Sequence, residues 1–382
     1  MDRGNYVSRV ERVRQIMSQR GLDVVIITYW PNLFYITGIV FGGFGNPMPL
    51  LIPLEGDPTF VSPLGFYQMV RDNYPFLNAE KVSINETPWR KVKSILEEWG
   101  VASGKIGIES RHITSVQRDI LRELLPKSEF EDCSDIVESI RMVKSEEELK
   151  CIRKACEITD EVYEVIMEDI LKPGKTELEV SREIVCALIE KGGEERIFPL
   201  YTGASFYPQV RFGINTVYTS VRSTNKKCSQ GDIILVDYGA VYGGYCADIT
   251  RAAVVGSPTE KQKKIFEHVQ SLLDKTLQII KPGIKAAEVY NFVCKELKKE
   301  GMLKYFIGHR PGHGIGIESW ERPYLSPNDF TTIKPNMTLA VEPGIYIWEE
   351  GGFGIRLEDN VLVTEKGVEN LTKCPKELKV IL

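Results

Sequence analysis

The second part of the chain contains a divergent internal repeat. It relates two segments, LKPGKTELEVSREIVCALIEKGG (171–193) and IKPGIKAAEVYNFVCKELKKEG (280–301). Both begin with an apolar residue and Lys-Pro-Gly, continue into a helical pattern with Glu-Val at matching positions, and close on Gly. In the first copy, Thr176 and Glu179 have the spacing of a capping box. A strand hairpin follows each copy, which favours a true repeat over chance similarity. We therefore expect a domain built from two similar halves.

The first hairpin carries two aspartates. In DIILVDYGAVYGGYCADITR (232–251), Asp237 and Asp248 are equidistant from a turn at Tyr242-Gly243. This symmetry predicts that the two side chains face each other across the ladder and point to one face of the sheet.

The second hairpin repeats the arrangement with glutamates. In TLAVEPGIYIWEEGGFGIRLEDNVLV (338–363), Glu342 and Glu358 are symmetric about Glu350. Like charges opposed on one face destabilise a sheet, and the apolar strands around them indicate that they lie in or beside the core. Burying a carboxylate without a partner costs free energy, so we expect a bound metal at these residues. The alternative is that the carboxylates lie on a solvated surface.

A histidine in a glycine-rich loop is the fifth candidate ligand. His313 lies in GHRPGHGIGIESWERP (308–323), where a purely structural role is the alternative. Four carboxylates and one imidazole form a ligand set suited to two divalent ions such as Mn, Co, Fe or Zn. Two such ions about 3.5 to 4 Å apart can hold a bridging hydroxide for hydrolysis.

Composition argues against several other classes of protein. The chain has 382 residues, 43% of them hydrophobic and 26% charged, which is typical of globular proteins. Its 48 basic and 53 acidic residues leave no positive excess, so no nucleic-acid partner is expected. No apolar run approaches the roughly 20 residues of a membrane span, and the N-terminus lacks an apolar signal segment. We expect a soluble, cytoplasmic protein with eight reduced cysteines.

The first part of the chain alternates strand and helix patterns, which predicts an α/β domain. A long charge-rich helix is expected across 139–170, and we place the domain boundary near residue 140, giving domains 1–140 and 141–382. The strand-like runs are DVVIITY (23–29), MPLLIPL (48–54), PTFVSPL (58–64) and GKIGIES (104–110), and the helical runs are WRKVKSILEEWG (89–100) and VQRDILRELLP (116–126).

These residues, in the contexts VDYG, GYCADITR, GHGIG, VEPG and IRLED, resemble the pita-bread metallopeptidases. That family includes Xaa-Pro dipeptidase (prolidase), aminopeptidase P, methionine aminopeptidase and the related creatinase. The resemblance covers essentially the whole chain, because TYWPNLFYITGI and LLIPLEGDPTFVSP are similar to the family's N-terminal domain. It implies a creatinase-like α/β domain followed by an α+β pita-bread domain with a pseudo-twofold repeat and a dinuclear site.

The resemblance also implies roles for single residues. Asp248, His313 and Glu358 would serve one or both ions together with Asp237 and Glu342. Glu342 would in addition shuttle the proton of the attacking water. A further catalytic residue is Arg356, which should share the metal-facing side of its strand with Glu358 and can orient a carboxylate bidentately.

Taken together, the resemblance implies a dinuclear hydrolase of the Xaa-Pro dipeptidase type. It would cut a C–N bond of a small peptide through a metal-bridging hydroxide, with Mn or Co as the foremost ions and Zn or Fe as alternatives. A homodimer is expected from the resemblance alone.

Two positions depart from the family pattern. Ser220 and Trp320 stand where prolidases and aminopeptidases P carry histidines that contact the substrate carbonyl. The segment FPLYTGASFYPQVRFGINT (198–216) is also long and closer in layout to creatinase. Two alternatives therefore stay open: the same site acting on a non-peptide amide or amidine, or a catalytically weak homologue that binds metal.

Other donors near these positions could replace the missing imidazoles. The candidates for substrate contacts are Tyr218, Ser220, Arg222, Arg310 and Trp320. For each of them a packing role is the alternative. Loss of one preorganised donor of this kind typically costs about 100- to 1000-fold in rate.

Overall fold

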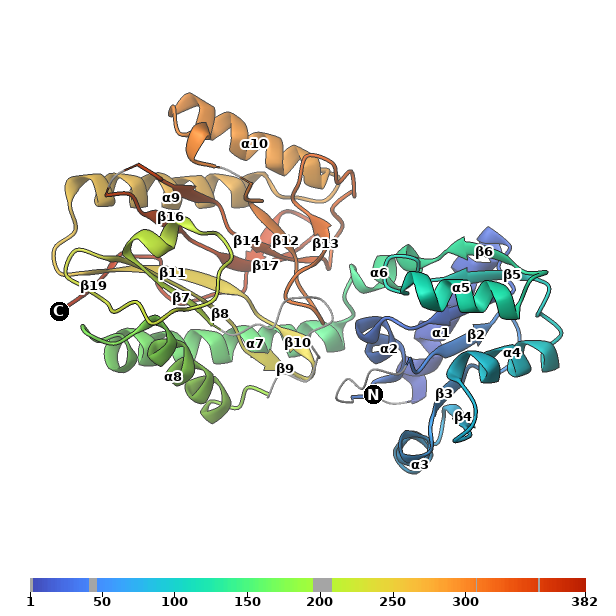
Figure 1. Ribbon diagram of the computed structural model, residues 1–382. Helices are drawn as coiled ribbons and strands as arrows, with labels where there is room; N and C mark the ends of the chain where they lie inside the picture. Colours follow the sequence, from blue (N-terminus) through green and yellow to red (C-terminus); the bar gives the residue numbers. More distant parts are fainter. Residues whose placement is uncertain (1–2, 41–46, 195–207, 307, 350) are drawn as a thin grey trace. The chain divides into compact units, whose positions relative to one another are not determined.

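The computed structural model describes residues 3–40, 47–194, 208–306, 308–349 and 351–382. The chain divides into two compact units, one ending at Arg141 and the other beginning at Met142 (Figure 1). The proposed boundary after residue 140 lies one residue before this division. Among the described residues, no helix combines the length and apolarity that crossing a membrane requires.

The first unit is built on a mixed six-stranded sheet in the order β4-β3-β2-β1-β5-β6. The four strand-like runs all form strands, and they occupy the sheet centre, where apolar runs are buried on both faces. Both edge strands were missed because their sequences, NAEKV and EFED, are polar. The strands are β1 (Val24–Ile27), β2 (Leu50–Pro53), β3 (Thr59–Pro63), β4 (Asn78–Val82), β5 (Lys105–Ile108) and β6 (Glu129–Asp132); the helices are α1 (Arg3–Arg20), α2 (Trp30–Thr37), α3 (Leu64–Asn73), α4 (Pro88–Glu98), α5 (Ser115–Leu124) and α6 (Ser134–Arg141).

The single long helix expected across residues 139–170 is wrong. Helix α6 ends at Arg141, and a new helix, α7 (Glu146–Val165), continues into the π-helical turn η1 (Ile166–Ile170). The break has a local cause, because Ser145 and Glu148 form a capping box that starts α7.

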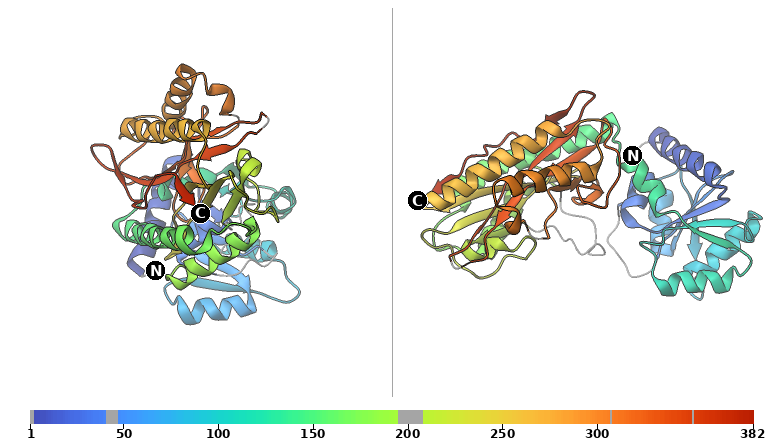
Figure 2. Two further views of the ribbon diagram at one scale, coloured as in Figure 1. Left: turned by 90° about the vertical axis from the view of Figure 1, so that its left-hand side faces the viewer. Right: turned by 90° about the horizontal axis from the view of Figure 1, so that it is seen from above.

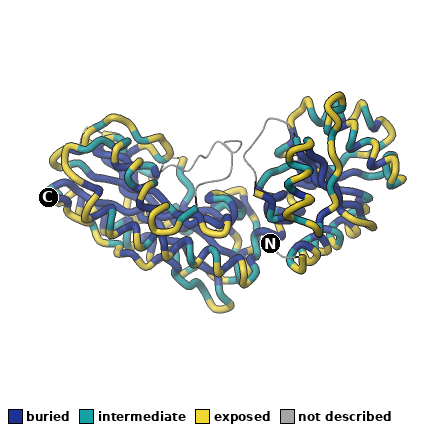
Figure 3. Tube along the Cα trace, turned by 90° about the horizontal axis from the view of Figure 1, so that it is seen from below, coloured by how far each residue is buried: buried dark blue, intermediate teal, exposed yellow. Residues whose placement is uncertain are grey.

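The second unit places its helices on the outside of two sheets, which are antiparallel except for the parallel pair β11-β19 (Figures 1 and 2). Helices α7 and α8 lie on one side and α9 and α10 on the other, while the buried chain is concentrated in the strands (Figure 3). The sheet orders are β19-β11-β8-β7 and β13-β12-β14-β17-β18, with two-stranded ribbons β10-β9 and β15-β16. The strands are β7 (Gln209–Phe212), β8 (Ile233–Tyr238), β9 (Val241–Tyr242), β10 (Tyr245–Cys246), β11 (Ile249–Val255), β12 (Gly312–Gly314), β13 (Glu321–Tyr324), β14 (Thr338–Val341), β15 (Gly344–Tyr346), β16 (Gly354–Arg356), β17 (Asp359–Val363), β18 (Val368–Asn370) and β19 (Lys379–Ile381); the remaining helices are α8 (Glu177–Glu190), α9 (Glu260–Ile279), α10 (Ala286–Lys299) and the short 3-10 turns η3 (Gly213–Val217) and η4 (Leu303–Tyr305).

The internal repeat is confirmed by matching elements in the two halves. Helices α8 and α10 have 14 residues each, and the helices before them, α7 and α9, have 20 each. Thr176 forms the predicted capping box with Glu179, and Lys285 occupies the corresponding position before α10 with Glu288. Each of these capping residues also bridges to a strand-like segment, Thr176 to Lys227 and Lys285 to Thr332. The pseudo-twofold architecture thus follows from a duplicated pattern of caps, helices and hairpins.

A buried ion pair holds the segment between α6 and α7 in the second unit. Lys144 Nζ lies 2.8 Å from Glu321 Oε1, and their side chains are only 1% and 7% exposed. The Lys144→Met variant should lose about 3 to 5 kcal/mol of unfolding free energy, because it breaks a buried ion pair by removing one of its two members. Urea unfolding followed by circular dichroism measures the change.

The matched control for this prediction is an exposed pair in the same unit. Arg153 and Glu369 lie 2.6 Å apart with side chains 43% and 41% exposed, so Arg153→Met should cost less than about 1 kcal/mol. Equal losses in the two variants would contradict the argument from burial.

Candidate active site

The first hairpin places its two aspartates on one face, with a register that differs from the expected one. Asp237 on β8 pairs with Thr250 on β11, so the predicted direct opposition of Asp237 and Asp248 is wrong by two residues. The turn lies one residue later than expected, at Gly243 and Gly244, whose φ angles of 60° and 77° suit a type I′ turn. Because side chains alternate with a period of two, a shift of two residues leaves Asp248 on the predicted face.

The second hairpin has the predicted symmetry. Val341, the last residue of β14, is opposite Asp359, the first residue of β17. Glu342 and Glu358 adjoin this pair, and both are buried, with exposed fractions of 9% and 1%. The two hairpins together contribute four buried carboxylates, called the site carboxylates below: Asp237, Asp248, Glu342 and Glu358.

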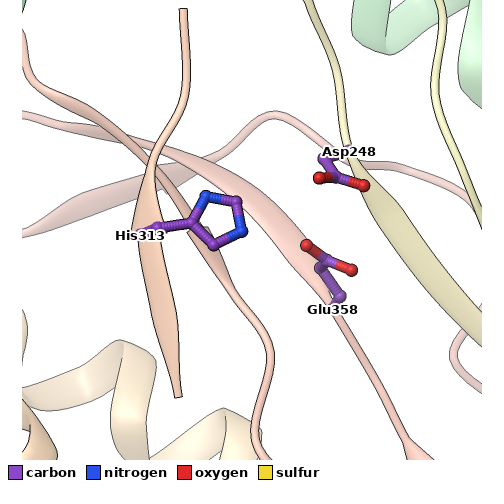
Figure 4. Close-up of side chains that lie close together, drawn as sticks. All are labelled: Asp248, His313 and Glu358. Atoms are coloured by element: carbon purple, nitrogen blue, oxygen red, sulfur yellow. The ribbon is translucent and has the colours of Figure 1, made fainter. Parts of the chain in front are cut away.

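Three of the predicted ligands converge in the core of the second unit. Ligand atoms of Asp248, His313 and Glu358 all lie within 4.8 Å of one another, and we call these residues the metal group (Figure 4). His313 extends from β12 toward the two carboxylates. Its Nδ1 is 3.0 Å from Gly314 O, and donation there leaves Nε2 as the ring atom that can accept a metal.

The electrostatics of the metal group call for a cation. Asp248 Oδ1 and Glu358 Oε1 are buried and have no hydrogen-bond partner among the described residues. Burial, reinforced by the charge of Glu358, raises the pKa of Asp248 well above its usual value. Burial and the charges of Glu342 and Asp237 do the same to the pKa of Glu358. Two carboxylates and an imidazole with this excess of negative charge fit a divalent transition metal.

Glu342 lies beside the metal group in a different electrostatic environment. Its Oε1 is 3.3 Å from His313 Nε2, and its Oε2 is 3.4 Å from Arg356 Nε and 3.6 Å from His309 Nε2. Burial acts to raise the pKa of Glu342, but His309, His313 and Arg356 outweigh it and lower that pKa to about 2. Glu342 is therefore a carboxylate at neutral pH and can accept a proton.

Asp237 is held by two buried guanidinium groups. Arg356, singled out from the sequence, donates to Asp237 Oδ2, and Arg211 Nη2 donates to the same oxygen at 3.0 Å. Arg211 lies on β7 and also contacts Gln209 Oε1 and Tyr218 O. Burial and the neighbouring charge of Arg356 lower the pKa of Arg211 to about 10, which still leaves it protonated at neutral pH. Arg211 was not predicted from the sequence, because the residue pattern of β7 does not show that this strand pairs with β8 or that Arg211 contacts Asp237.

Two uncharged side chains that support the metal group were also missed. Thr250 Oγ1 donates to Glu358 Oε2 at 2.7 Å, and Asn360 Oδ1 accepts from Asp248 N at 2.9 Å. Thr250 could have been found, because it follows Asp248 by two residues and therefore points to the same face. The Asn360 contact joins residues 112 positions apart and has no local signal.

Two of the predicted substrate contacts lie next to the metal group. The Trp320 ring centroid is 6.2 Å from that of His313 and 4.7 Å from that of Tyr324. The Arg310 guanidinium stacks over both Trp320 and Tyr324, at 5.1 Å from each ring. At position 320, where the resemblance predicts a histidine, the chain thus has an aromatic ring that stacks with a guanidinium group.

The other predicted substrate contacts lie on the exposed segment after η3. Tyr218 packs against Trp348 with ring centroids 5.5 Å apart, and its carbonyl oxygen accepts from Arg211. Ser220 and Arg222 are exposed and make no hydrogen bond or ion pair with another described residue. Residues 198–207 of the long segment similar to creatinase fall outside the described residues.

Comparison with known proteins decides the family. The sequence pattern of Metallopeptidase family M24 matches residues 150–365, more than half of the chain. The chain belongs to this family. Residues 9–143 of the M24 chain match the Creatinase/Prolidase N-terminal domain, so the predicted fold is confirmed in both parts.

The relatives of this M24 metallopeptidase include several Xaa-Pro dipeptidases. That of Pyrococcus horikoshii is 33% identical over 377 residues, covering 97% of this chain and 98% of the relative. That of Pyrococcus furiosus is 32% identical over 373 residues, covering 97% and 99%. The crystal structure of recombinant prolidase from Thermococcus sibiricus superposes with a TM-score of 0.88 at 30% identity, covering 100% of both chains. The chain is therefore similar to Xaa-Pro dipeptidases over its whole length.

Proposed function

We propose that this M24 metallopeptidase is a divalent-metal-dependent dipeptidase that hydrolyses the C–N bond of small Xaa-Pro peptides. The observation that carries the proposal is the buried metal group, in which Asp248 and Glu358 each present an oxygen that has no hydrogen-bond partner among the residues described. Full-length similarity to Xaa-Pro dipeptidases supports the substrate class.

The residues of the site divide the work of hydrolysis. Asp248, His313 and Glu358 would hold the ion, which when bound supplies Lewis-acid polarisation of the scissile carbonyl and lowers the pKa of water. Glu342, anionic at neutral pH, accepts the proton of the attacking water at its carboxylate and returns it to the leaving nitrogen. Arg356 contacts both Asp237 and Glu342 and so holds their carboxylates in place.

A second candidate function is hydrolysis of a non-peptide amide or amidine at the same site. The observation that favours it is the stack of Arg310, Trp320 and Tyr324 beside His313. This surface offers a guanidinium and aromatic faces in place of an imidazole, which changes the groups available to contact a substrate carbonyl. A small planar substrate with a carboxylate would suit it.

Turnover of a substrate panel tests the two candidates. The metal-free protein is loaded with Mn or Co and assayed on Ala-Pro and other Xaa-Pro dipeptides, with Ala-Ala, creatine and cyclic amides as comparators. We expect Xaa-Pro turnover that disappears on chelation and returns when the ion is added back, because the buried carboxylates require the cation.

The comparators decide between the alternatives. Turnover of creatine or a cyclic amide with none of any dipeptide would select the second function. If the protein has bound metal but hydrolyses no compound of the panel, it is a catalytically weak homologue. Choice of Mn or Co, a homodimer and a cytoplasmic location stay predictions.

A further inference from the structure

Glu177 is a fully buried carboxylate that lies outside the metal group and accepts four hydrogen bonds from one stretch of chain. Its Oε1 accepts from Phe212 N at 2.8 Å and from Asn215 Nδ2 at 2.9 Å. Its Oε2 accepts from Thr224 N at 2.8 Å and from Thr224 Oγ1 at 2.6 Å. One side chain thus holds together the two ends of residues 213–224, which we call the η3 segment.

The backbone at the start of α8 strengthens this attachment. The first N–H groups of a helix have no acceptor within the helix and need one outside it. Glu177 N donates to Lys226 O at 3.0 Å, and Leu178 N donates to Thr224 O at 3.1 Å. An acidic side chain at the first residue of a helix is also favoured by the helix dipole. The base of the η3 segment is therefore fixed to the first turn of α8.

The tip of the η3 segment is bound to the candidate active site. Tyr218 O accepts from Arg211 Nη1, and Thr219 O accepts from Arg356 Nη1 at 3.2 Å. Both guanidinium groups also donate to a site carboxylate, and Arg356 Nε lies 3.4 Å from Glu342 Oε2. A single residue, Arg356, thus separates the tip from the proposed proton acceptor.

The side chains at the tip are open to solvent. Tyr218 is 42% exposed and packs edge-to-face against Trp348, which is 48% exposed. Ser220 and Arg222 are exposed as well. Aromatic side chains that are open to solvent beside a buried reactive group are well placed to contact a substrate. The η3 segment thus offers such contacts, and Glu177 determines where the segment lies.

We propose that Glu177 is a positioning residue for substrate binding, which acts by fixing the η3 segment as one wall of the substrate site. Its four hydrogen bonds go to this segment and not to the metal group or to Glu342. Its replacement should therefore weaken substrate binding more than it slows the chemical step. The inference rests on the proposed function for its kinetic readout, since that readout needs a substrate.

Glu177→Gln in the full-length protein loaded with Mn tests the proposal. Gln has nearly the same shape, but its NH₂ group cannot accept the hydrogen bonds made to one of the two carboxylate oxygens. Leaving a buried donor without an acceptor shifts an equilibrium by about 10-fold or more. We expect KM for Ala-Pro to rise about 10-fold, while kcat and bound Mn stay within about twofold of wild type. Hydrogen exchange in the η3 segment should become at least about 10-fold faster.

Two further variants make the result specific. Glu183→Gln makes the same change at a 44% exposed side chain of α8 that pairs with Lys175, and it should leave KM and exchange unchanged. Thr224→Val removes one of the four hydrogen bonds at an exposed residue and should raise KM about 2- to 5-fold. Thr224→Val keeps the test decisive if Glu177→Gln does not fold.

The readouts separate this role from the alternatives. Unchanged KM or unchanged exchange in a folded Glu177→Gln variant would overturn the proposal. A loss of kcat that parallels a loss of bound Mn would overturn it too, because Glu177 would then support the fold of the whole site. If wild type hydrolyses no Xaa-Pro dipeptide, the proposed function fails, and exchange alone decides whether Glu177 fixes the η3 segment.

Discussion

The Asp248→Ala variant is expected to lose metal binding and hydrolysis together. Asp248 is one of three residues in the metal group, and its Oδ1 has no hydrogen-bond partner in the part of the chain that the structure describes. Loss of a residue that only orients a ligand typically costs about 10- to 100-fold in metal affinity or activity, so loss of a ligand should exceed about 100-fold. Bound Mn measured by mass spectrometry and turnover of an Xaa-Pro dipeptide give the two readouts.

Stability separates this effect from misfolding. In the metal-free protein, Asp248 is a buried carboxylate repelled by Glu358, so its removal should not lower the melting temperature. Asp274→Ala is the matched control, because Asp274 is half exposed on α9 and pairs with Lys376 at the surface. Full metal content in the Asp248→Ala variant would show that the ion binds elsewhere.

The Glu342→Gln variant is expected to keep its metal and to turn over substrate about 100- to 10,000-fold more slowly. The range is the usual contribution of a positioned general base. Gln has nearly the shape of Glu but cannot accept a proton, whereas Glu342, with a pKa near 2, is fully available as a carboxylate. The metal group is untouched, so the loss should appear in kcat rather than in metal content.

Glu349→Gln provides the same chemical change outside the site. Glu349 is exposed and pairs with Tyr305 and Lys304, so its replacement should leave kcat unchanged. A Glu342→Gln enzyme with wild-type kcat would exclude Glu342 as the proton acceptor. A loss of Mn that parallels the loss of kcat would instead assign Glu342 to metal binding.

Residue type and spacing pointed to most of the candidate site. Carboxylates symmetric about hairpin turns, set among apolar strands, indicated buried pairs, and β14 with β17 has the expected register. The first hairpin shows the limit of this reasoning, because the position of its turn depends on which residues can take positive φ. Gly243 and Gly244 do so together, and the register moves by two residues.

The one capping box predicted from the sequence is confirmed. Thr176 with Glu179 starts α8 as expected, and the break before α7 could have been found from the same signal at Ser145 and Glu148. The polar edge strands were missed because an edge strand needs no apolar run to be stable once its neighbour is in place. Their formation is a property of the sheet rather than of the segment.

By itself the sequence determined the repeat, the hairpins, the family and the residue types of the site. Capping, alternation and turn preference act over a few residues, which makes such features readable along the chain. Only the tertiary structure decided that Arg211 and Arg356 share one oxygen of Asp237 and that Thr250 holds Glu358. These contacts join residues 26 to 119 positions apart, and they depend on how strands from both halves pack side by side. The candidate ligands could therefore be read from the sequence, but the contacts that hold them in place could not.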